Sequence, residues 1–393
     1  MNICFISQEY PPDTHVGGIG TYTLNMASAL TRLGHLVHVI ASTQQHARTV
    51  NDNAVWIHRV KKRKILPKEL EFLVYSYSVA KRISQLQCQF DIVQASEFAG
   101  EGFYYSLNKR YPLVTRLATP FFLTEKLNGK TVFGPRPFFD WMERKQSFGS
   151  DGIFTSSNAL AAEVTATWKI NPTQINVIPN SVDVSRIVQM SNDKPAPDIL
   201  ENEEYLLYFG RLEERKGVRV LADALPVVLE KYPFLSMVFI GADLGFHGNP
   251  LKEYIVRKME KYQERLFFFD NLTQEKLFPI VNRAKIVILP SLWEAFGFVC
   301  VEAMALGRPV VATSGSGFEE IIEDGISGYL VEPGNRELLS QKIINVLNDE
   351  TSLNLVSEGA RKRAQEYEVM NIAPKLLEYY RKVRAGYFKK RGC

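Results

Sequence analysis

Short runs of apolar residues recur along the whole chain and predict strands. The runs are rich in β-branched and aromatic residues and do not alternate with polar ones, which is typical of strands buried on both faces of a parallel sheet. In the first half they read NICFIS, LVHVIA, VWIHRV, DIVQAS, PLVTRL, GIFTS and INVIP, and in the second half YLLYFG, SMVFIG, RLFFFD, KIVILP, PVVAT and GYLV. Residues at helical spacing fill the gaps between the runs, as in the stripe of Tyr22, Met26, Leu30 and Leu33 ahead of Gly34. This alternation predicts a doubly wound α/β architecture.

The alternation is interrupted once, between residues 182 and 205. This stretch is polar, contains two prolines and shows little periodicity, so it predicts a linker over residues 184–204. The chain then divides into two Rossmann-like, doubly wound parallel-sheet domains facing each other across a cleft. We expect the first domain over residues 1–183 and the second over 205–365. A charged helix over 366–393 is expected to pack back on the first domain.

Composition places the chain among ordinary globular proteins and narrows its partners. Of its 393 residues, 46% are apolar and 23% are charged, which suits normal hydrophobic cores. The net charge of +4 is mild, and with no long basic arm or zinc spacing it argues against nucleic acid as a partner. The four cysteines are expected to be reduced thiols. We expect a cytoplasmic protein, because the N-terminus lacks the features of a signal peptide and no apolar run could span a membrane.

One local charge cluster lies in the first domain: five of the six residues from Arg59 to Lys64 are basic. The cluster is either a solvated loop or a contact for an anionic surface, such as a phosphorylated acceptor or a membrane leaflet. In the second case the protein would associate peripherally with the inner face of a membrane.

A glycine-rich turn, HVGGIGTY over residues 15–22, follows the first apolar run. It does not fit the dinucleotide pattern G-x-G-x-x-G, and it lacks the lysine of an ATP-binding loop. The backbone amides of Gly17, Gly18 and Ile19 would still open a helix at the carboxyl end of a strand, which suits an anion in general. The alternative is a glycine turn without a ligand.

The segment PSLWEAFGFVCVEAMALGRPVVAT carries two glutamates, Glu294 and Glu302, with seven residues between them. We expect EAFG to form a turn and FVCVEAMALG the helix that it opens. The amides of Phe296, Gly297 and Phe298 would then point at whatever lies before the helix, and the two carboxylates could hold the hydroxyls of a sugar and a ribose. The alternative is a pair of surface glutamates on an amphipathic helix.

The segment YFGRLEERKG offers two cations after another predicted strand. Gly210 ends the strand, Arg211 follows it, and Lys216 comes five residues later. An arginine presents a fork of donors to phosphate oxygens, and a lysine adds a point charge. The alternative is a pair of solvated loop cations.

These segments together carry a resemblance that covers essentially the whole chain. GRLEERKG, followed by PSLWEAFGFVCVEAMALGRPVVAT, resembles the C-terminal domain of the family-4 glycosyltransferases of the GT-B fold. PPDTHVGGIGTYTLNMASALTRLGHLVHVI resembles their acceptor domain, and GSGFEEIIEDGISGYLV matches the segment that follows the second glutamate. The glutamate segment with its flanks is highly specific, whereas the glycine turn by itself is not.

The resemblance implies a role for each matching residue. Arg211 and Lys216 would bind the donor pyrophosphate, Glu294 would contact the transferred sugar, and Glu302 would hold the ribose hydroxyls. The remaining implied donor contacts are Gly17 and Gly18 at the distal phosphate, Phe269 and Leu272 near the base, and Gly210, Ala295, Phe296, Gly297 and Phe298.

The chemistry that the resemblance implies is retaining transfer of a hexose from a nucleotide diphosphate sugar, with UDP as the expected carrier. The acceptor hydroxyl would attack from the side that the diphosphate leaves, and the leaving phosphate would take its proton. We expect no cofactor, because the nucleotide sugar is itself the donor substrate, and no metal, because no D-x-D pair stands in a suitable loop. The chain departs from the family at Ala118, where many members have a histidine, and at Ser181, where they have a glycine.

The acceptor is expected to be a sugar, a lipid-linked molecule or a small molecule. Residues 121–146 are aromatic and mixed in charge, so they either line an acceptor pocket or form a packed helix and loop. Two other classes of function stay open. One is another enzyme on the same fold, such as a nucleotide-sugar epimerase or a glycogen-type phosphorylase. The other is a non-catalytic protein that binds nucleotide sugars.

Overall fold

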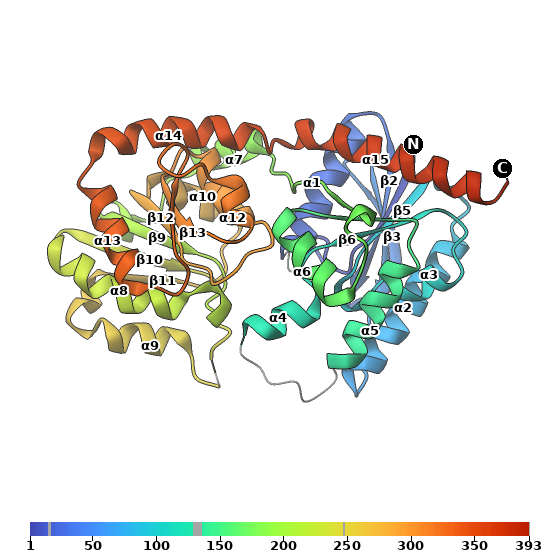
Figure 1. Cartoon of the computed structure of the whole chain (residues 1–393), viewed down its shortest axis with the longest axis horizontal. Helices are drawn as coiled ribbons and strands as arrows, with labels where there is room; N and C mark the ends of the chain where they lie inside the picture. The colour runs from blue at the N-terminus through green and yellow to red at the C-terminus, as the bar shows by residue number, and fades with distance from the viewer. Residues whose placement is uncertain (15–16, 129–135, 247, 393) are drawn as a thin grey trace. The chain divides into compact units, whose positions relative to one another are not determined.

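The computed structural model describes residues 1–14, 17–128, 136–246 and 248–392, and the chain divides into two compact units (Figure 1). The first unit comprises residues 1–181 together with 369–393, and the second comprises 182–368. Each is built on a largely parallel sheet with helices between its strands, so the predicted doubly wound α/β architecture is confirmed.

The sheet of the first unit has the strand order β3-β4-β2-β1-β5-β6-β7-β8. Each apolar run of the first half forms one of its strands, which are β1 (Asn2–Ile6), β2 (Leu36–Thr43), β4 (Val55–Lys61), β5 (Ile92–Ser96), β6 (Leu113–Leu117), β7 (Gly152–Thr155) and β8 (Ile175–Val177). The edge strand β3 (Arg48–Asp52) was not predicted and is antiparallel to β4. Its residues are mostly exposed, so it lacks the apolar run by which the other strands were recognised.

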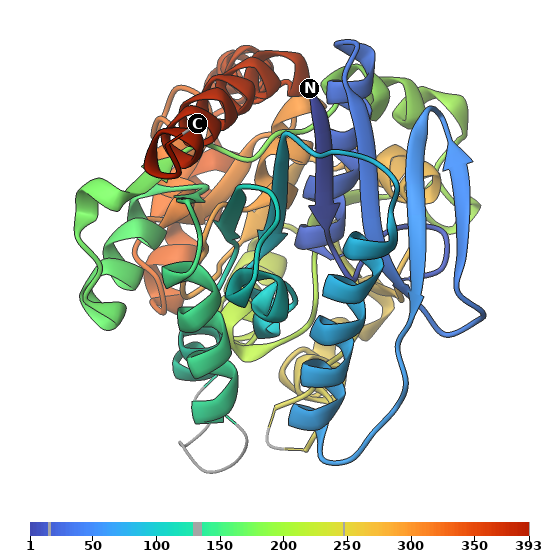
Figure 2. The same cartoon turned by 90° about the vertical axis from the view of Figure 1, so that its right-hand side faces the viewer.

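The helices of the first unit connect these strands and cover the sheet (Figure 2). They are α1 (Gly18–Arg32), α2 (Lys68–Gln85), α3 (Phe103–Leu107), α4 (Phe121–Leu127), α5 (Arg136–Phe148) and α6 (Asn158–Trp168). Gly34 follows α1 with φ +80°, the left-handed conformation expected after the end of a helix. The last helix, α15 (Val369–Lys390), also belongs to this unit. It packs on β7, where Gly152 leaves room for Tyr379 and Val383.

The sheet of the second unit is parallel, with the order β11-β10-β9-β12-β13-β14. Each apolar run of the second half forms one of its strands, which are β9 (Glu204–Phe209), β10 (Leu235–Ile240), β11 (Leu266–Phe269), β12 (Ile286–Leu289), β13 (Val310–Thr313) and β14 (Tyr329–Val331). Apolar clusters cover both faces of this sheet, which is why its strands lack alternation.

Eight further helices are described in the second unit. They are α7 (Val184–Asp193), α8 (Val218–Lys231), α9 (Leu251–Lys258), α10 (Gln274–Arg283), α11 (Phe298–Ala305), α12 (Gly317–Ile321), α13 (Arg336–Leu347) and α14 (Glu350–Gln365). None of the helices described in either unit is long and apolar enough to cross a bilayer.

Helix α7 differs from the linker predicted over residues 184–204. It is capped by Asp183, whose side chain accepts a hydrogen bond from the Arg186 amide, and it packs against α10 and α11. Val184, Ile187 and, beyond the helix, Leu200 are buried in the core of the second unit. These few apolar side chains are enough to fix a short helix on a larger core, although the segment is polar overall.

The basic cluster from Arg59 to Lys64 does not form a continuous exposed surface. Arg59 is buried, donates a hydrogen bond to the carbonyl of Tyr10 (2.8 Å) and lies near the Asp13 carboxylate. The residues on either side of it in β4 are buried as well, so Arg59 is part of the interior of the unit. The side chains of the cluster that are exposed are Lys61, Arg63 and Lys64.

Candidate functional site

The sequence-predicted residues of the second unit lie at one edge of its sheet. β9 pairs with β10 on one side and with β12 on the other, so the chain crosses over in opposite directions from β9. Ligands of open α/β sheets bind at the carboxyl ends of the strands at such a point. Gly210, Arg211 and Lys216 follow β9, and Glu294 follows β12.

Two close backbone approaches fix the loop after β9. Gly210 has φ +145°, and a Cβ added to Gly241 would lie 2.1 Å from the carbonyl oxygen of Gly210. Gly217 has φ +67°, and a Cβ there would lie 1.8 Å from the carbonyl oxygen of Pro290. Glycine is therefore required where the loop after β9 meets the loop after β12.

Arg211 takes part in a charged group that the sequence did not predict. Its guanidinium pairs with the Glu213 carboxylate (3.0 Å), which also pairs with Arg215 (2.8 Å). Glu213 and Arg215 are buried, whereas the Arg211 side chain is 52% exposed. Glu213 thus holds one arginine inside the protein and a second one facing solvent at the strand ends.

Lys216 and Glu294 form an ion pair between the two loops. The Lys216 ammonium lies against the Glu294 carboxylate, which also accepts a hydrogen bond from the Ser291 hydroxyl (3.1 Å). Burial alone would raise the pKa of Glu294, but the positive charges of Lys216 and Arg215 outweigh it and hold that pKa below its ordinary value. Burial lowers the pKa of Lys216, although the charge of Glu294 opposes this shift. The Glu294 carboxyl is thus held ionised beside its partner.

The predicted turn EAFG and the helix after it are confirmed. Gly297 has φ +96° and caps α11, which begins at Phe298. A Cβ on Gly297 would lie 2.2 Å from the Phe318 ring, and the Gly317 amide donates to the Glu294 carbonyl (2.9 Å). Among the described residues, none accepts a hydrogen bond from the amides of Gly297 and Phe298. These donors are the unsatisfied first turn of α11.

Glu302 lies four residues into α11 and is buried. No hydrogen bond or ion pair joins its carboxyl group to a described residue, although its oxygens are not among the completely enclosed unpaired atoms. Burial raises the pKa of Glu302 to about 7. A buried carboxyl group without a partner is costly, and it would gain from hydroxyl donors supplied by a ligand.

The other predicted donor contacts of the second unit lie around this edge and have apolar side chains. Phe269 ends β11, and its side chain and that of Leu272 are partly buried against the core. Ala295 and Phe296 are buried beside Glu294. These positions can offer backbone groups and apolar surface.

In the first unit, the glycine turn does open a helix at the carboxyl side of β1, as predicted. Gly17 caps α1, which begins at Gly18. However, the Glu9 carboxylate accepts hydrogen bonds from the amides of Gly17 (2.9 Å) and Gly20 (3.3 Å). The Gly17 amide is therefore satisfied from within the chain, and the contact of Gly17 and Gly18 with a phosphate stays a prediction. An anionic group does occupy the helix start, but it comes from the chain.

Two buried carboxylates that the sequence did not single out hold the loop after β6. Glu97 accepts hydrogen bonds from the amides of Ala118 (2.8 Å) and Thr119 (2.9 Å), and Glu143 accepts one from Phe121 (2.9 Å). Burial raises the pKa of Glu97, although the hydrogen bond from Ala118 opposes the shift. The loop with Ala118 in place of the expected histidine is thus anchored through its backbone. Residues 129–135 of the proposed acceptor segment lie outside the described residues.

Two family models match the chain, one over each half. The model described as Glycosyltransferase Family 4 matches residues 16–186, and the model described as Glycosyl transferases group 1 matches residues 189–363. The chain belongs to the family-4 glycosyltransferases of the GT-B fold. Each candidate loop described above lies wholly or mostly within one of these matched ranges.

Known glycosyltransferases resemble this one over nearly their whole length. An uncharacterised glycosyltransferase of Methanocaldococcus jannaschii is 26% identical over 398 residues, which cover 97% of this chain and 98% of that one. The solved sucrose-phosphate synthase of Thermosynechococcus elongatus is 18% identical, covers 98% and 99% of the two chains, and superimposes with a TM-score of 0.79. HepE of Anabaena, solved in complex with UDP-glucose, is 19% identical, covers 97% and 100%, and has a TM-score of 0.69.

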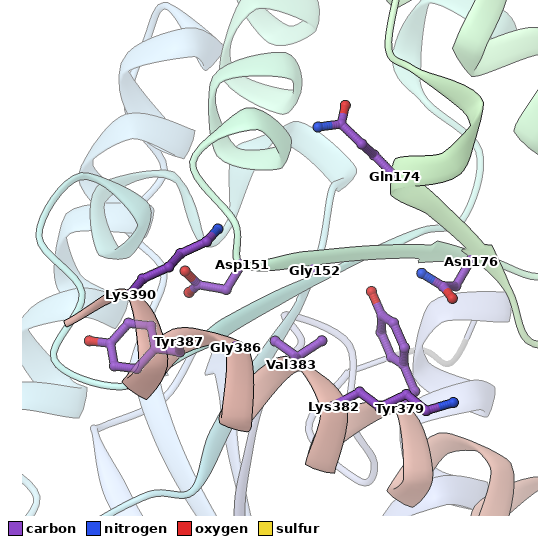
Figure 3. Close-up of a pocket in the computed structure, with 10 residues that line it drawn as sticks. All are labelled: Asp151, Gly152, Gln174, Asn176, Tyr379, Lys382, Val383, Gly386, Tyr387 and Lys390. Atoms are coloured by element: carbon purple, nitrogen blue, oxygen red, sulfur yellow. The ribbon is translucent and has the colours of Figure 1, made fainter. Parts of the chain in front are cut away.

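One cavity of the glycosyltransferase lies away from these loops. It measures about 280 Å³ and lies beside α15, with Tyr379, Val383 and Tyr387 on one side and Asn176 on the other (Figure 3). Gly152, which also lines it, is the first residue of β7, so the cavity is at the amino ends of the strands. In the same unit, the candidate residues Gly17 and Gly18 instead follow the carboxyl end of β1. In the described part of the chain, no group of three or more metal-ligating side chains is present.

Proposed function

We propose that this glycosyltransferase moves a hexose from a UDP-linked donor to a hydroxyl acceptor, with retention of the anomeric configuration. The observation that carries the proposal is the position of the Lys216–Glu294 ion pair. It lies where two neighbouring strands of the second unit end, with Arg211 and Arg215 beside it. A bound sugar diphosphate needs cations beside its phosphates and a carboxylate beside the hydroxyls of its sugar. The ion pair and its neighbouring arginines bring such groups together.

In this proposal, Lys216 and Arg211 stabilise the leaving diphosphate. As the bond between the anomeric carbon and the phosphate oxygen breaks, negative charge collects on that oxygen. Cations already fixed by Glu294 and Glu213 need little reorganisation to meet it, which is the main source of catalysis in such sites. Loss of one such donor raises the barrier by about 3 kcal/mol.

The acceptor hydroxyl attacks the anomeric carbon from the face that the diphosphate leaves. Its oxygen forms the new bond, and its proton passes to the departing phosphate oxygen. Glu294 binds the transferred hexose through its hydroxyls. The unpaired amides of Gly297 and Phe298 serve the sugar or the phosphate next to it.

The remaining contacts hold the nucleoside. Glu302 is proposed to accept hydrogen bonds from the ribose hydroxyls, because it is largely buried and forms no hydrogen bond or ion pair with a described residue. Backbone groups between Phe269 and Leu272 would meet the base. The amides of Gly17 and Gly18 are proposed to contact the distal phosphate, in which case the phosphate replaces Glu9 as the acceptor for Gly17.

UDP is proposed as the carrier because HepE, which shares the fold, was solved with UDP-glucose. The cations of the site can balance the diphosphate charge, so we propose that no divalent metal and no further cofactor take part. The acceptor is proposed to be a sugar, a lipid-linked molecule or a small molecule. It would approach the loop from Ala118 to Phe121, which offers no imidazole.

The test is to incubate the protein with UDP-glucose, first alone and then with a panel of hydroxyl acceptors. We expect an acceptor-dependent release of UDP, with an α-linked product identified by NMR from its anomeric coupling. An inverted, β-linked product would contradict the retaining mechanism. Formation of UDP-galactose without an acceptor would instead indicate an epimerase. Tight binding of UDP-glucose without any turnover across the panel would indicate a binding protein.

A further inference from the structure

Helices α2 and α5 of the first unit expose apolar side chains where surface helices normally expose charged ones. Their exposed large apolar residues are Leu70, Tyr77, Trp141 and Phe148. Lys81 and Lys145 are the exposed charged residues among their described side chains. We call these six residues the α2/α5 face. Surface helices usually carry their charged residues on the solvent side, so this pattern indicates a binding surface.

Helix α5 buries three polar side chains and exposes two aromatic ones. Glu143, Gln146 and Ser147 are fully buried, and each forms hydrogen bonds inside the unit. Trp141 and Phe148 are 43% and 52% exposed. The inward side chains thus serve the structure of the first unit, and the outward aromatic residues have no internal role that would account for their exposure.

Aromatic contacts join the two helices into one surface. Tyr77 of α2 meets Tyr104 of α3 with ring centroids 5.5 Å apart, and Trp141 of α5 meets Phe103 of α3 at 5.1 Å. Helix α3 packs against both α2 and α5, and the rings of Phe72 and Phe139 join the two helices directly, with centroids 5.3 Å apart. The exposed Tyr77 and Trp141 are therefore linked through α3.

The exposed charges of this patch are of one sign. Lys81 lies one helical turn after Tyr77, and Lys145 one turn after Trp141, so each lysine shares the face of an aromatic residue. The carboxylates of the same helices are less exposed than the lysines: Glu143 is buried, and Glu69, Glu71 and Asp140 are half-buried. Glu71 pairs with Lys62 (3.4 Å), and Asp140 accepts a hydrogen bond from the Trp168 indole (2.9 Å).

We propose that the α2/α5 face binds the surface of an anionic lipid bilayer. Tryptophan and tyrosine are suited to the boundary between headgroups and acyl chains, where one end of the ring is apolar and the other is wet. Lysines at the same level are attracted to anionic headgroups. The exposed Arg63 and Lys64, which precede α2, add to this attraction. A protein partner would need no such excess of one charge.

The binding is peripheral, because it uses side chains on the outside of two packed helices. It accounts for the part of the basic cluster that is exposed, and it does not depend on the donor or on the proposed chemistry. It also bears on the acceptor, since a glycosyltransferase held at a bilayer meets lipid-linked hydroxyls at high local concentration.

The first test compares two tryptophans of matched exposure in the same unit. Trp141 is 43% exposed on α5, and Trp56 is 42% exposed on β4. The full chain should sediment with vesicles of phosphatidylcholine and phosphatidylglycerol, and much less with phosphatidylcholine alone. Trp141→Ala should weaken this partitioning on the order of tenfold, and Trp56→Ala should leave it unchanged. Melting temperatures near that of the wild type would show that both variants are folded.

The second test compares two double charge reversals that change the net charge of the chain by the same amount. Lys81→Glu with Lys145→Glu should reduce vesicle binding by more than about tenfold, because each lysine near the surface contributes about a fivefold factor. Lys375→Glu with Lys389→Glu, on exposed positions of α15, is the matched control and should bind as the wild type. Added salt should weaken the binding of the wild type.

The proposal is overturned if the wild type does not bind anionic vesicles at low ionic strength. It is also overturned if Trp56→Ala and Trp141→Ala lose binding equally, or if the α15 control loses as much as the α2 and α5 pair. If Trp141→Ala dissociates a dimer in size-exclusion chromatography and leaves vesicle binding unchanged, the face joins two copies of the chain and the lipid proposal is wrong.

Discussion

Lys216 and Glu294 form an ion pair that is largely shielded from solvent, with side chains 16% and 8% exposed, and each depends on the other. Removing one partner of a buried ion pair leaves an uncompensated charge, which typically destabilises a protein by about 3–5 kcal/mol. Replacing both partners by neutral groups of similar size can be almost neutral for stability. This difference separates a structural role of the pair from a catalytic one.

We therefore predict different outcomes for Lys216→Met alone and for Lys216→Met combined with Glu294→Gln. The single variant should lower the melting temperature, because Glu294 keeps its charge without its partner. The double variant should recover most of that stability and still lose on the order of a hundredfold in turnover of UDP-glucose, since the leaving diphosphate lacks its cation. The test is to measure the melting temperature and the turnover of both variants and of the wild type. A double variant with wild-type turnover would show that the pair is only structural.

The raised pKa of the Glu302 carboxyl group should make the stability of the folded protein depend on pH. Its pKa is raised by burial to about 7, whereas the unfolded chain titrates near the ordinary value of 4.5. The folded protein thus favours the protonated group, and the contribution to stability is complete below pH 4.5 and lost as the pH rises through 7. The loss amounts to about 3 kcal/mol. Glu302→Gln should remove this component from urea unfolding measured at pH 5 and pH 8, and an unchanged difference would contradict the burial effect.

The same residue predicts how donor binding responds to pH. If ribose hydroxyls donate to its carboxylate, the affinity for UDP-glucose should increase between pH 6 and pH 8. UDP-glucose is the suitable probe because, unlike UDP, it has no terminal phosphate that titrates in this range. Glu302→Gln should bind more weakly at pH 8 and with little dependence on pH. Equal affinities of the two proteins at pH 8, measured by calorimetry, would remove Glu302 from the donor site.

At the scale of elements, we predict that the loop after β6 is held in place by Glu97. Glu97→Ala leaves the amides of Ala118 and Thr119 without their acceptor. Hydrogen exchange at these two amides should then accelerate on the order of tenfold, the equivalent of about one hydrogen bond. Glu163→Ala on α6 is the control, because the Glu163 side chain is partly exposed and pairs with an exposed lysine. Unchanged exchange at Ala118 would show that the loop is held by other contacts.

Elements with a strong local signal could be predicted from the sequence. The buried strands were visible as apolar runs, and the turn at Gly297 was visible because a glycine precedes a helical pattern. Helix α7 and strand β3 were missed for the opposite reason. α7 buries only a few side chains on a core formed by distant segments, and β3 is an exposed edge strand that depends on its partner β4.

The candidate site also contains residues that could be predicted from the sequence and residues that could not. Arg211, Lys216 and Glu294 follow strands and could be located from spacing and from resemblance to a family. The residues that hold them could not. Glu9 meets Gly17 across a loop, and Glu213 is recognisable as an anchor only once both of its arginines are placed around it. Contacts of this kind depend on tertiary structure and leave no periodic trace in the sequence.

At the scale of the whole molecule, the proposal requires donor contacts in both units. Hydrogen exchange of the full chain can test this without assuming their arrangement. Addition of UDP-glucose should slow exchange at Arg211 and at Gly297 and Phe298 in the second unit. It should also slow exchange at Gly18 in the first unit. Protection confined to the second unit would remove the glycine turn from the donor site and leave the rest of the proposal intact.

The most direct test of the central claim is calorimetric titration of UDP into the full chain and into Arg211→Ala. Arg219→Ala is the control, because Arg219 is another partly exposed arginine of the same unit, and its side chain lies on α8 over the rings of Phe246 and Tyr254. We predict that the wild type and Arg219→Ala bind UDP alike and that Arg211→Ala binds on the order of tenfold more weakly or worse. Failure of the wild type to bind UDP, or equal affinity of all three proteins, would contradict the claim that the cations after β9 hold the diphosphate.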